Sequence, residues 1–140
     1  MTWDNDCNKE IKRRIAQATG GMAGFKTIWN SKHISISTKL SIIKTCVMSV
    51  LLYACETWTL RKREKDSLLA YEMKCYRRIL HIRRQQKITN VEIRQRLKVE
   101  RNVVQLIMEM KLKLFGHICR MDDNRLVKVV VFGIMDGKNK

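Results

Sequence analysis

The stretch LSIIKTCVMSVLLYAC, Leu40–Cys55, is the most apolar part of the chain. It carries one charge, Lys44, near its start, and it is shorter than the roughly 20 residues that a bilayer span needs. The pattern therefore predicts a buried helix over residues 38–56, capped by Ser37 or Thr38. Because this helix is apolar nearly all round, we expect it to be the most buried of the fold.

Further helices are predicted on both sides of this run. The chain has no proline and is rich in helix-favouring residues, so long uninterrupted helices are expected. Apolar residues recur at three- and four-residue steps, and Thr89 with Glu92 fits a capping box. The sequence thus predicts an all-α fold of about six helices, although Val-rich residues near the end also allow a strand, LVKVVVFG. The additional helices are expected at 7–29, 62–81, 90–98, 101–120 and 125–132.

Glycines mark two expected irregularities in these helices. Gly20 and Gly21 weaken the first helix by about 1 kcal/mol each relative to alanine, so a bend is expected there. Gly133 is expected to end the last helix, which leaves residues 134–140 as a flexible tail.

Charge is the strongest compositional signal. Lys and Arg total 29 against 13 Asp and Glu, which gives the 140 residues a net charge of +16. Such a surplus attracts polyanions, so nucleic acid is the first partner to consider and an anionic membrane surface is the second. The five cysteines form no C-x-x-C pair, and the polar start MTWDNDCNKEIKRR is unlike a signal peptide. We therefore expect reduced thiols in an intracellular protein of the nucleus and cytoplasm, without a membrane partner.

The basic residues concentrate between Arg61 and Arg101, where 14 Lys or Arg accompany 5 Asp or Glu. The densest part is KCYRRILHIRRQQK, Lys74–Lys87. A solvated surface normally mixes both signs, whereas acids are scarce here, so we expect cations that no neighbouring carboxylate neutralises. Such cations would contact phosphate, and the sequence shows no code for recognising bases. The expected nucleic-acid-binding residues are Lys12, Arg13, Arg14, Arg61, Lys62, Arg63, Lys74, Arg77, Arg78, Arg83, Arg84 and Lys87.

The stretch GHICRMDDNRL contains the residues most suggestive of a metal or catalytic site. His117 and Cys119 are two residues apart, so they do not share a helical face, and tetrahedral zinc would need two further ligands. Asp122 and Asp123 precede a predicted helix, where capping and the helix dipole explain them. No nucleophile triad, phosphate loop or HExxH motif is present. We therefore expect neither a metal site nor catalytic residues.

The order of several short motifs resembles a known family. They are Glu10-Ile11 with Arg14-Ile15-Ala16, Ile34-Ser35 with Thr38-Lys39, Leu52-Tyr53 with Glu56-Thr57-Trp58, then YRRILHI and LFGHICRMDDNRL. Together they resemble the region after the polymerase core of the endonuclease/reverse transcriptases of non-LTR (LINE-type) retrotransposons. The resemblance covers nearly the whole chain.

The resemblance implies an organisation and an activity for the parent protein. Residues 1–58 resemble the thumb, a helical subdomain that holds the template–primer duplex, and residues 59–133 resemble the basic helical region after it. The intact protein would be a Mg-dependent RNA-directed DNA polymerase. Its palm carries a Tyr-x-Asp-Asp box that this sequence lacks, so no cofactor is expected here. The expected partners are RNA or an RNA–DNA duplex and the polymerase core.

Three functions are compatible with these observations. The first is a non-catalytic, all-helical fragment of a retroelement reverse transcriptase that grips nucleic acid through phosphate contacts. The second is a stand-alone DNA-binding module in which residues 90–98 and 101–120 act as a helix-turn-helix, although the second of these helices is very apolar. The third is a decayed remnant that serves protein interaction or has no function of its own.

Overall fold

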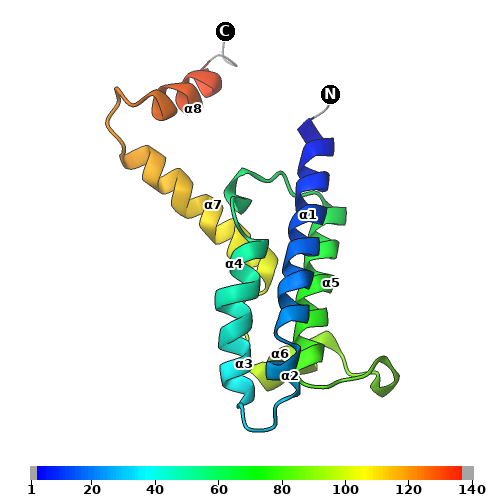
Figure 1. Cartoon of the computed structure of the whole chain (residues 1–140). Helices are drawn as coiled ribbons and strands as arrows, with labels where there is room; N and C mark the ends of the chain where they lie inside the picture. Colours follow the sequence, from blue (N-terminus) through cyan, green and yellow to red (C-terminus); the bar gives the residue numbers. More distant parts are fainter. Residues whose placement is uncertain (1–2, 137–140) are drawn as a thin grey trace.

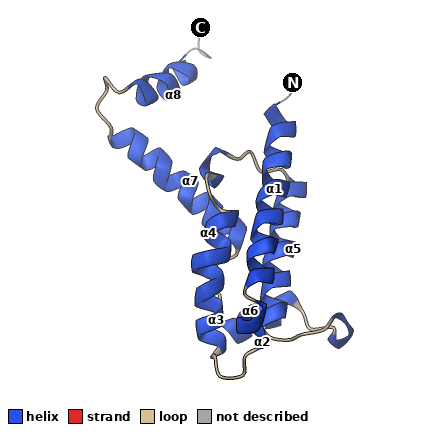
Figure 2. Cartoon of the chain, in the orientation of Figure 1, coloured by secondary structure: helices blue, strands red, loops and turns tan. Residues whose placement is uncertain are grey.

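Helices make up the regular structure of residues 3–136, which are the residues that the computed structural model describes; side chains are described for 7–133 (Figure 2). The all-α prediction is confirmed for this range, and a strand at LVKVVVFG is wrong because those residues are helical. No helix among the described residues is long and apolar enough to cross a membrane. The elements are α1 (Trp3–Gly24), α2 (Lys26–Asn30), α3 (Ile36–Ile42), a π-helical turn (Ile43–Val47), α4 (Met48–Leu51), a 3-10 turn (Cys55–Thr57), α5 (Lys62–Ile79), a second 3-10 turn (Arg84–Gln86), α6 (Asn90–Leu97), α7 (Val103–Arg120) and α8 (Leu126–Asp136).

Three rods form the body of the molecule (Figure 1). The first rod is α1, the second is the continuous run of α3, the π turn and α4, and the third is α5, which contacts both. The short helices α2 and α6 lie at one end of the rods (Figure 1). The beginning of α7 packs on α5 and on the first 3-10 turn, and its other end extends away from the body and carries α8.

The second rod buries one face only. Leu40, Ile43, Val47 and Leu51 are buried at three- and four-residue steps, as the sequence pattern requires of an amphipathic helix. Lys44 and its neighbours on the opposite face are exposed. The expectation that this helix is the most buried of the fold is therefore wrong. The most buried helix is α5, with eight buried side chains, because it contacts α1, α2, α3, α6 and α7.

One hydrophobic core joins both halves of the chain. It contains Ile11 and Trp29 from the predicted thumb together with Leu68, Ile93 and Ile107 from the segment after it. The predicted boundary at residues 58/59 falls in the connection between the first 3-10 turn and α5. The two predicted segments thus share a core across that boundary.

The ends of the first two helices differ from the prediction. The first helix begins at Trp3 and breaks at Phe25, whereas Gly20 and Gly21 continue it without interruption. Ser35, not Ser37 or Thr38, caps the second rod: it has an extended backbone, and its side chain accepts a hydrogen bond from the amide of Thr38 at 3.2 Å. The rod ends at Leu51 and not at 56, since Ala54 has a left-handed backbone.

Caps also explain the ends of the later helices. Thr89 accepts a hydrogen bond from the amide of Glu92 at 3.3 Å, as predicted, but the Glu92 carboxylate pairs with Arg96 at 2.7 Å and does not bond back to Thr89. Asn102 caps α7 and forms a capping box with Gln105.

The last helix is longer than predicted. Gly133 does not end α8, because the backbone stays helical through this glycine and on to Asp136. Residues 134–136, predicted to belong to the tail, are therefore part of the helix, and residues 137–140 lie outside the described part of the chain.

Candidate nucleic-acid interface

A cationic groove lies between the second half of α5 and the segment that joins α5 to α6. Its volume is about 1050 Å³. The rest of its lining is apolar or neutral, and no carboxylate contributes. Half of the twelve predicted binding residues meet here, although they come from a helix, a loop and a 3-10 turn. They are Lys74, Arg77, Arg78, Arg83, Arg84 and Lys87.

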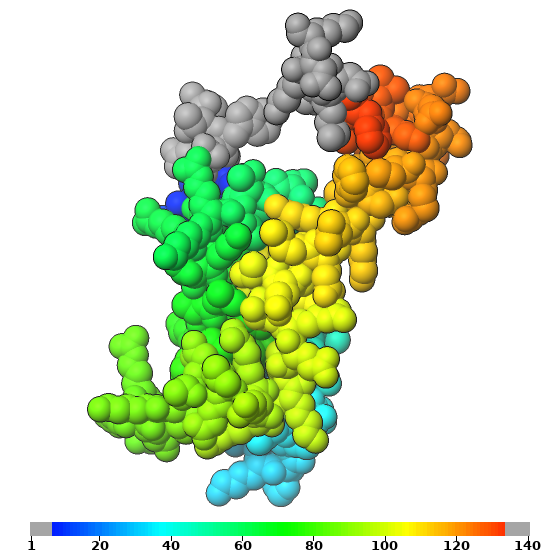
Figure 3. All heavy atoms as spheres, turned by 180° about the vertical axis from the view of Figure 1, so that it is seen from behind, coloured from blue at the N-terminus to red at the C-terminus, as the bar shows by residue number. Residues whose placement is uncertain are grey.

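The joining segment projects as an arm because the chain turns sharply at both of its ends. His81 and Lys87 have left-handed backbones, with φ of 54° and 48°. At the first turn the amide of Ile82 donates to the carbonyl of Arg77 and that of His81 to the carbonyl of Arg78, which is the Schellman arrangement that ends a helix. Figure 3 shows the arm standing out from the body. We call residues 82–88 the arm.

Arg77 holds the base of the arm in place. Its guanidinium donates to the Asn90 side-chain oxygen at 2.6 Å and to the Ile88 carbonyl at 3.4 Å. It therefore ties the end of α5 to the start of α6, and its role in the groove is one of positioning.

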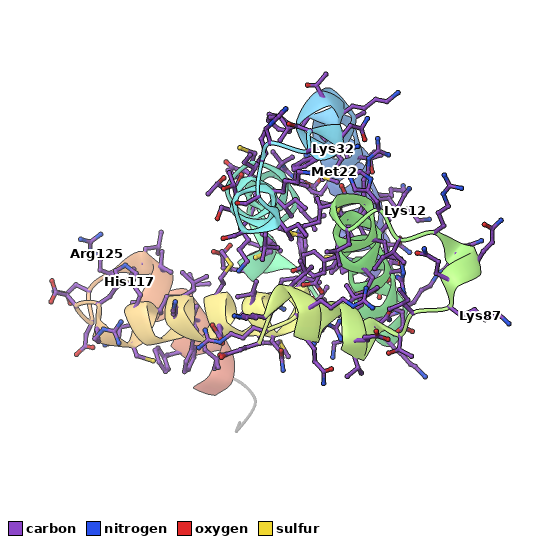
Figure 4. All side chains as sticks on the ribbon, turned by 90° about the horizontal axis from the view of Figure 1, so that it is seen from below. Lys12, Met22, Lys32, Lys87, His117 and Arg125 are labelled. Carbon is purple, nitrogen blue, oxygen red and sulfur yellow. The ribbon has the colours of Figure 1, made fainter. Side chains whose placement is uncertain are left out.

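The other groove cations are directed to solvent. All of them are exposed, and within the described residues none is paired with a carboxylate. Figure 4 shows Lys87 pointing away from the body. With no acid to neutralise them, they create a region of positive potential that favours an anionic ligand. They are Lys74, Arg78, Arg83, Arg84 and Lys87.

The cations predicted on the first helix are arranged differently. Glu10 accepts hydrogen bonds from Arg13 and from Arg14, each at 2.9 Å, and the bond from Arg13 lowers the pKa of Glu10. Arg14 also lies over the ring of Tyr53, with its guanidinium carbon 4.7 Å from the ring centre. The expectation that no carboxylate neutralises these two arginines is wrong. The sequence contained the signal, because Glu10 precedes them by three and four residues.

The remaining predicted cations lie at the other end of α5. Lys12 and Arg63 line a small hollow between α1 and α5, and Lys62 is exposed beside it. Arg61 precedes α5, and its backbone amide donates to Glu64 at 3.1 Å. Since α5 spans about 27 Å from end to end, the structure does not bring this group together with the groove.

Buried polar residues behind the groove were not foreseen from the sequence. Glu72 is 1% exposed; its carboxylate accepts a hydrogen bond from the Tyr76 hydroxyl at 2.9 Å and lies 3.8 Å from Arg94. Burial raises the pKa of Glu72. Tyr71 is buried as well, so neither tyrosine of α5 presents an open ring face for base stacking.

The residues of GHICRMDDNRL do not converge on a site. His117 and Cys119 are both exposed on α7, and Lys128 binds Asp123 at 2.7 Å and lowers its pKa. No group of three or more His, Cys, Asp or Glu in the described residues is placed to hold a metal ion. Elsewhere, burial raises the pKa of two thiols to about 11, those of Cys55 and Cys75.

The helix-turn-helix alternative requires a free N-terminal end on its second helix, because that end contacts the bases. In α7 this end faces the core. Val103 and Ile107 are fully buried, and α7 packs on α5. This packing argues against α6 and α7 as a recognition unit.

The segment from the last turn of α1 to α4 is held together by an internal hydrogen-bond network. The Trp29 indole donates to the carbonyl of Met22 at 2.8 Å. Lys39, only 4% exposed, donates to the carbonyls of Trp29 and Ser31, each at 2.8 Å. Its ammonium group thus closes the C-terminal end of α2, where a positive charge is favourable. Sequence reasoning missed it, since lysines are seldom buried.

Residues 22–53, which contain this network, match a family described as a domain of unknown function, DUF6451. No curated protein and no solved structure matches the chain. The matched residues end before the cationic groove begins.

Proposed function

We propose that this chain is a non-catalytic nucleic-acid-binding fragment that grips an RNA–DNA duplex through phosphate contacts. The observation that carries the proposal is the groove of about 1050 Å³, lined by six cations and no carboxylate. Phosphate is the anion that repeats along a surface of this size, and Arg and Lys are its usual ligands. The contacts would position the duplex without selecting its sequence.

The buried tyrosines favour a duplex over a single strand. Proteins that bind single strands combine a positive groove with aromatic rings on which bases stack. Here the groove offers cations, but the ring of Tyr71 is buried in its wall. A duplex keeps its bases stacked on one another and presents two rows of phosphates on its outside, which suits a groove lined by cations without stacking rings.

The resemblance of the motifs supplies the biological setting of the proposal. On that basis the chain is the thumb and post-thumb region of a non-LTR retrotransposon reverse transcriptase, working in the nucleus and cytoplasm. Polymerisation and Mg²⁺ binding would belong to the polymerase core, which is the proposed protein partner.

A second candidate function, protein contact, is favoured by one surface. The far end of α7 and α8 exposes large apolar side chains, among them Leu112 at 70% and Leu126 at 76%. Exposed apolar surface of this kind often marks an interaction site. Replacing Leu112 and Leu126 with glutamate should then abolish binding to a co-expressed polymerase core while leaving duplex binding unchanged.

Fluorescence anisotropy with a labelled RNA–DNA duplex tests the nucleic-acid proposal. The variant combines Arg83→Gln, Arg84→Gln and Lys87→Gln, which removes three charges from the arm. We expect it to bind at least tenfold more weakly at about 0.1 M salt, since each lost phosphate contact weakens association. Equal binding by the variant and the native chain would refute the proposal.

The matched control removes the same charge far from the groove. It combines Lys113→Gln, Arg120→Gln and Arg125→Gln, all exposed residues of the α7–α8 region. Arg125 and Lys87 lie on opposite sides of the molecule (Figure 4). Screening confines each charge to about 10 Å at 0.1 M salt. The control should therefore bind like the native chain.

A further inference from the structure

A small cavity between α1 and α5 adjoins the cationic groove. Its volume is about 100 Å³, roughly the space of three water molecules. Thr19 lines it from α1, and Tyr71, Lys74 and Arg78 line it from α5. The last three residues also line the groove, so they form the wall that the two spaces share.

The hydroxyl of Tyr71 has no hydrogen-bond partner in this wall. Tyr71 is 6% exposed, and its oxygen bonds to no described residue. The Thr19 hydroxyl donates to the carbonyl of Ile15 at 2.7 Å, and Thr19 and Cys75 both lie near enough to the Tyr71 hydroxyl to affect its pKa. Leaving a buried hydroxyl unpaired costs about 1–3 kcal/mol. Burial also raises the pKa of Tyr71, so at neutral pH the group keeps its proton and can donate it.

Two cations share the helical face of this hydroxyl. Lys74 and Arg78 follow Tyr71 by three and seven residues, a spacing that places all three side chains in one row along α5. Both cations are exposed, and neither pairs with a carboxylate of the described chain. The acid of the same helix, Glu72, is instead engaged with Tyr76 and Arg94.

We propose that Tyr71, Lys74 and Arg78 bind the terminal phosphate of a nucleic-acid strand that lies in the groove. A phosphate monoester carries about −1.5 to −2 charges at pH 7 and presents three acceptor oxygens. Two cations and one neutral donor match that charge and that number of acceptors. The presence of a strand in the groove rests on the proposed function, whereas the phosphate site itself rests only on the cavity and its lining residues.

The small volume of the cavity favours a terminal over an internal phosphate. An internal phosphate carries a single charge and is tethered to the strand on two sides, which keeps it at the surface of the groove. A terminal phosphate is tethered on one side only and can enter the cavity next to the groove. A space of about 100 Å³ admits a phosphate group but no base.

The test compares Tyr71→Phe with Tyr76→Phe, two variants that each lose one buried hydroxyl of α5. The probe is an RNA–DNA duplex with phosphate at all its ends, against the same duplex with hydroxyl ends. We expect the native chain and Tyr76→Phe to prefer the phosphorylated duplex by about tenfold, the effect of one hydrogen bond to a charged group. Tyr71→Phe should lose most of this preference. It should unfold at a urea concentration no lower than that of the native chain, because the substitution removes a buried hydroxyl that has no partner.

Two results would overturn the inference. One is equal binding of both duplexes by the native chain. The other is an equal preference in Tyr71→Phe and the native chain. Inorganic phosphate, followed through the NMR signals of the Tyr71 ring, separates this inference from the proposed function. Saturable shifts that Lys74→Gln abolishes would uphold the phosphate site even if no duplex bound, whereas unchanged signals would refute it.

Discussion

Salt should weaken duplex binding by the native chain far more than binding by the arm variant with Arg83→Gln, Arg84→Gln and Lys87→Gln. The structure fixes the size of this difference. Five groove cations are free to meet phosphate, because Arg77 is committed to Asn90. Each phosphate contact contributes about −0.9 to the slope of log affinity against log salt concentration, so the groove accounts for a slope of about −4.5.

The same arithmetic gives the affinities to be measured. Raising salt from about 50 mM to about 200 mM should reduce native affinity by about 500-fold for a slope of −4.5. The arm variant keeps two of the five contacts, so its slope should be about −1.8 and its loss about tenfold. The control variant on α7 and α8 should retain the native slope.

Anisotropy titrations at four salt concentrations provide the measurement, with circular dichroism confirming that each variant remains helical. The difference between the two slopes tests whether the arm contacts phosphate, because cations outside the groove contribute equally to the slope of each protein. If the slopes of the native chain and the arm variant agreed to within about half a unit, the arm would make no phosphate contacts.

Three further predictions concern the rest of the molecule. Lys39→Met should lower the free energy of unfolding by about 3 kcal/mol, because two carbonyls lose a charged donor; Lys44→Met, on the exposed face, should change it by under about 0.5 kcal/mol, and equal urea midpoints would contradict this. The stability of Glu72→Gln relative to the native chain should increase as the pH rises above 4.5, because a carboxyl with a raised pKa stabilises the fold when protonated and loses that contribution as it ionises. If the difference in unfolding free energy between the two proteins were constant between about pH 4 and pH 8, the raised pKa of Glu72 would be refuted. Iodoacetamide should label the exposed thiols of Cys46 and Cys119 in the folded protein and spare the two buried thiols until urea is added; mass spectrometry showing uniform labelling would contradict the packing.

Local sequence patterns predicted the helices because helical burial repeats at fixed steps. Leu40, Ile43, Val47 and Leu51 display that repeat in the sequence and lie on one buried face in the structure. Helix ends were less predictable. Ser37 or Thr38 was the predicted cap of the second rod, but Ser35 caps it, because the turn that precedes the helix gives Ser35 the extended backbone that a cap requires.

The cationic residues of the groove could be predicted as a group, but their individual roles could not. Charge density alone pointed to Lys74–Lys87. Arg77 stabilises the arm through its hydrogen bond to Asn90, which lies thirteen residues away. No local sequence pattern indicates such a contact. The pairing of Arg13 and Arg14 with Glu10, in contrast, was visible as spacing and was overlooked.

The different environments of the two α5 tyrosines could not be predicted either. Tyr71 and Tyr76 lie on the same helix, and both are buried. Their hydroxyls differ because Tyr76 meets the carboxylate of its own helix, while Tyr71 faces the space between α1 and α5. Which of two buried hydroxyls lacks a partner is a property of the packed fold.

Amide hydrogen exchange of the whole chain, with and without a saturating RNA–DNA duplex, tests the central claim most directly. It needs no substitution and reports on every segment at once. If the groove holds the duplex, exchange should slow across residues 74–90, in the last turns of α5 and in the arm, and remain unchanged across residues 112–131. Slower exchange in α7 and α8, with residues 74–90 unaffected, would contradict the account.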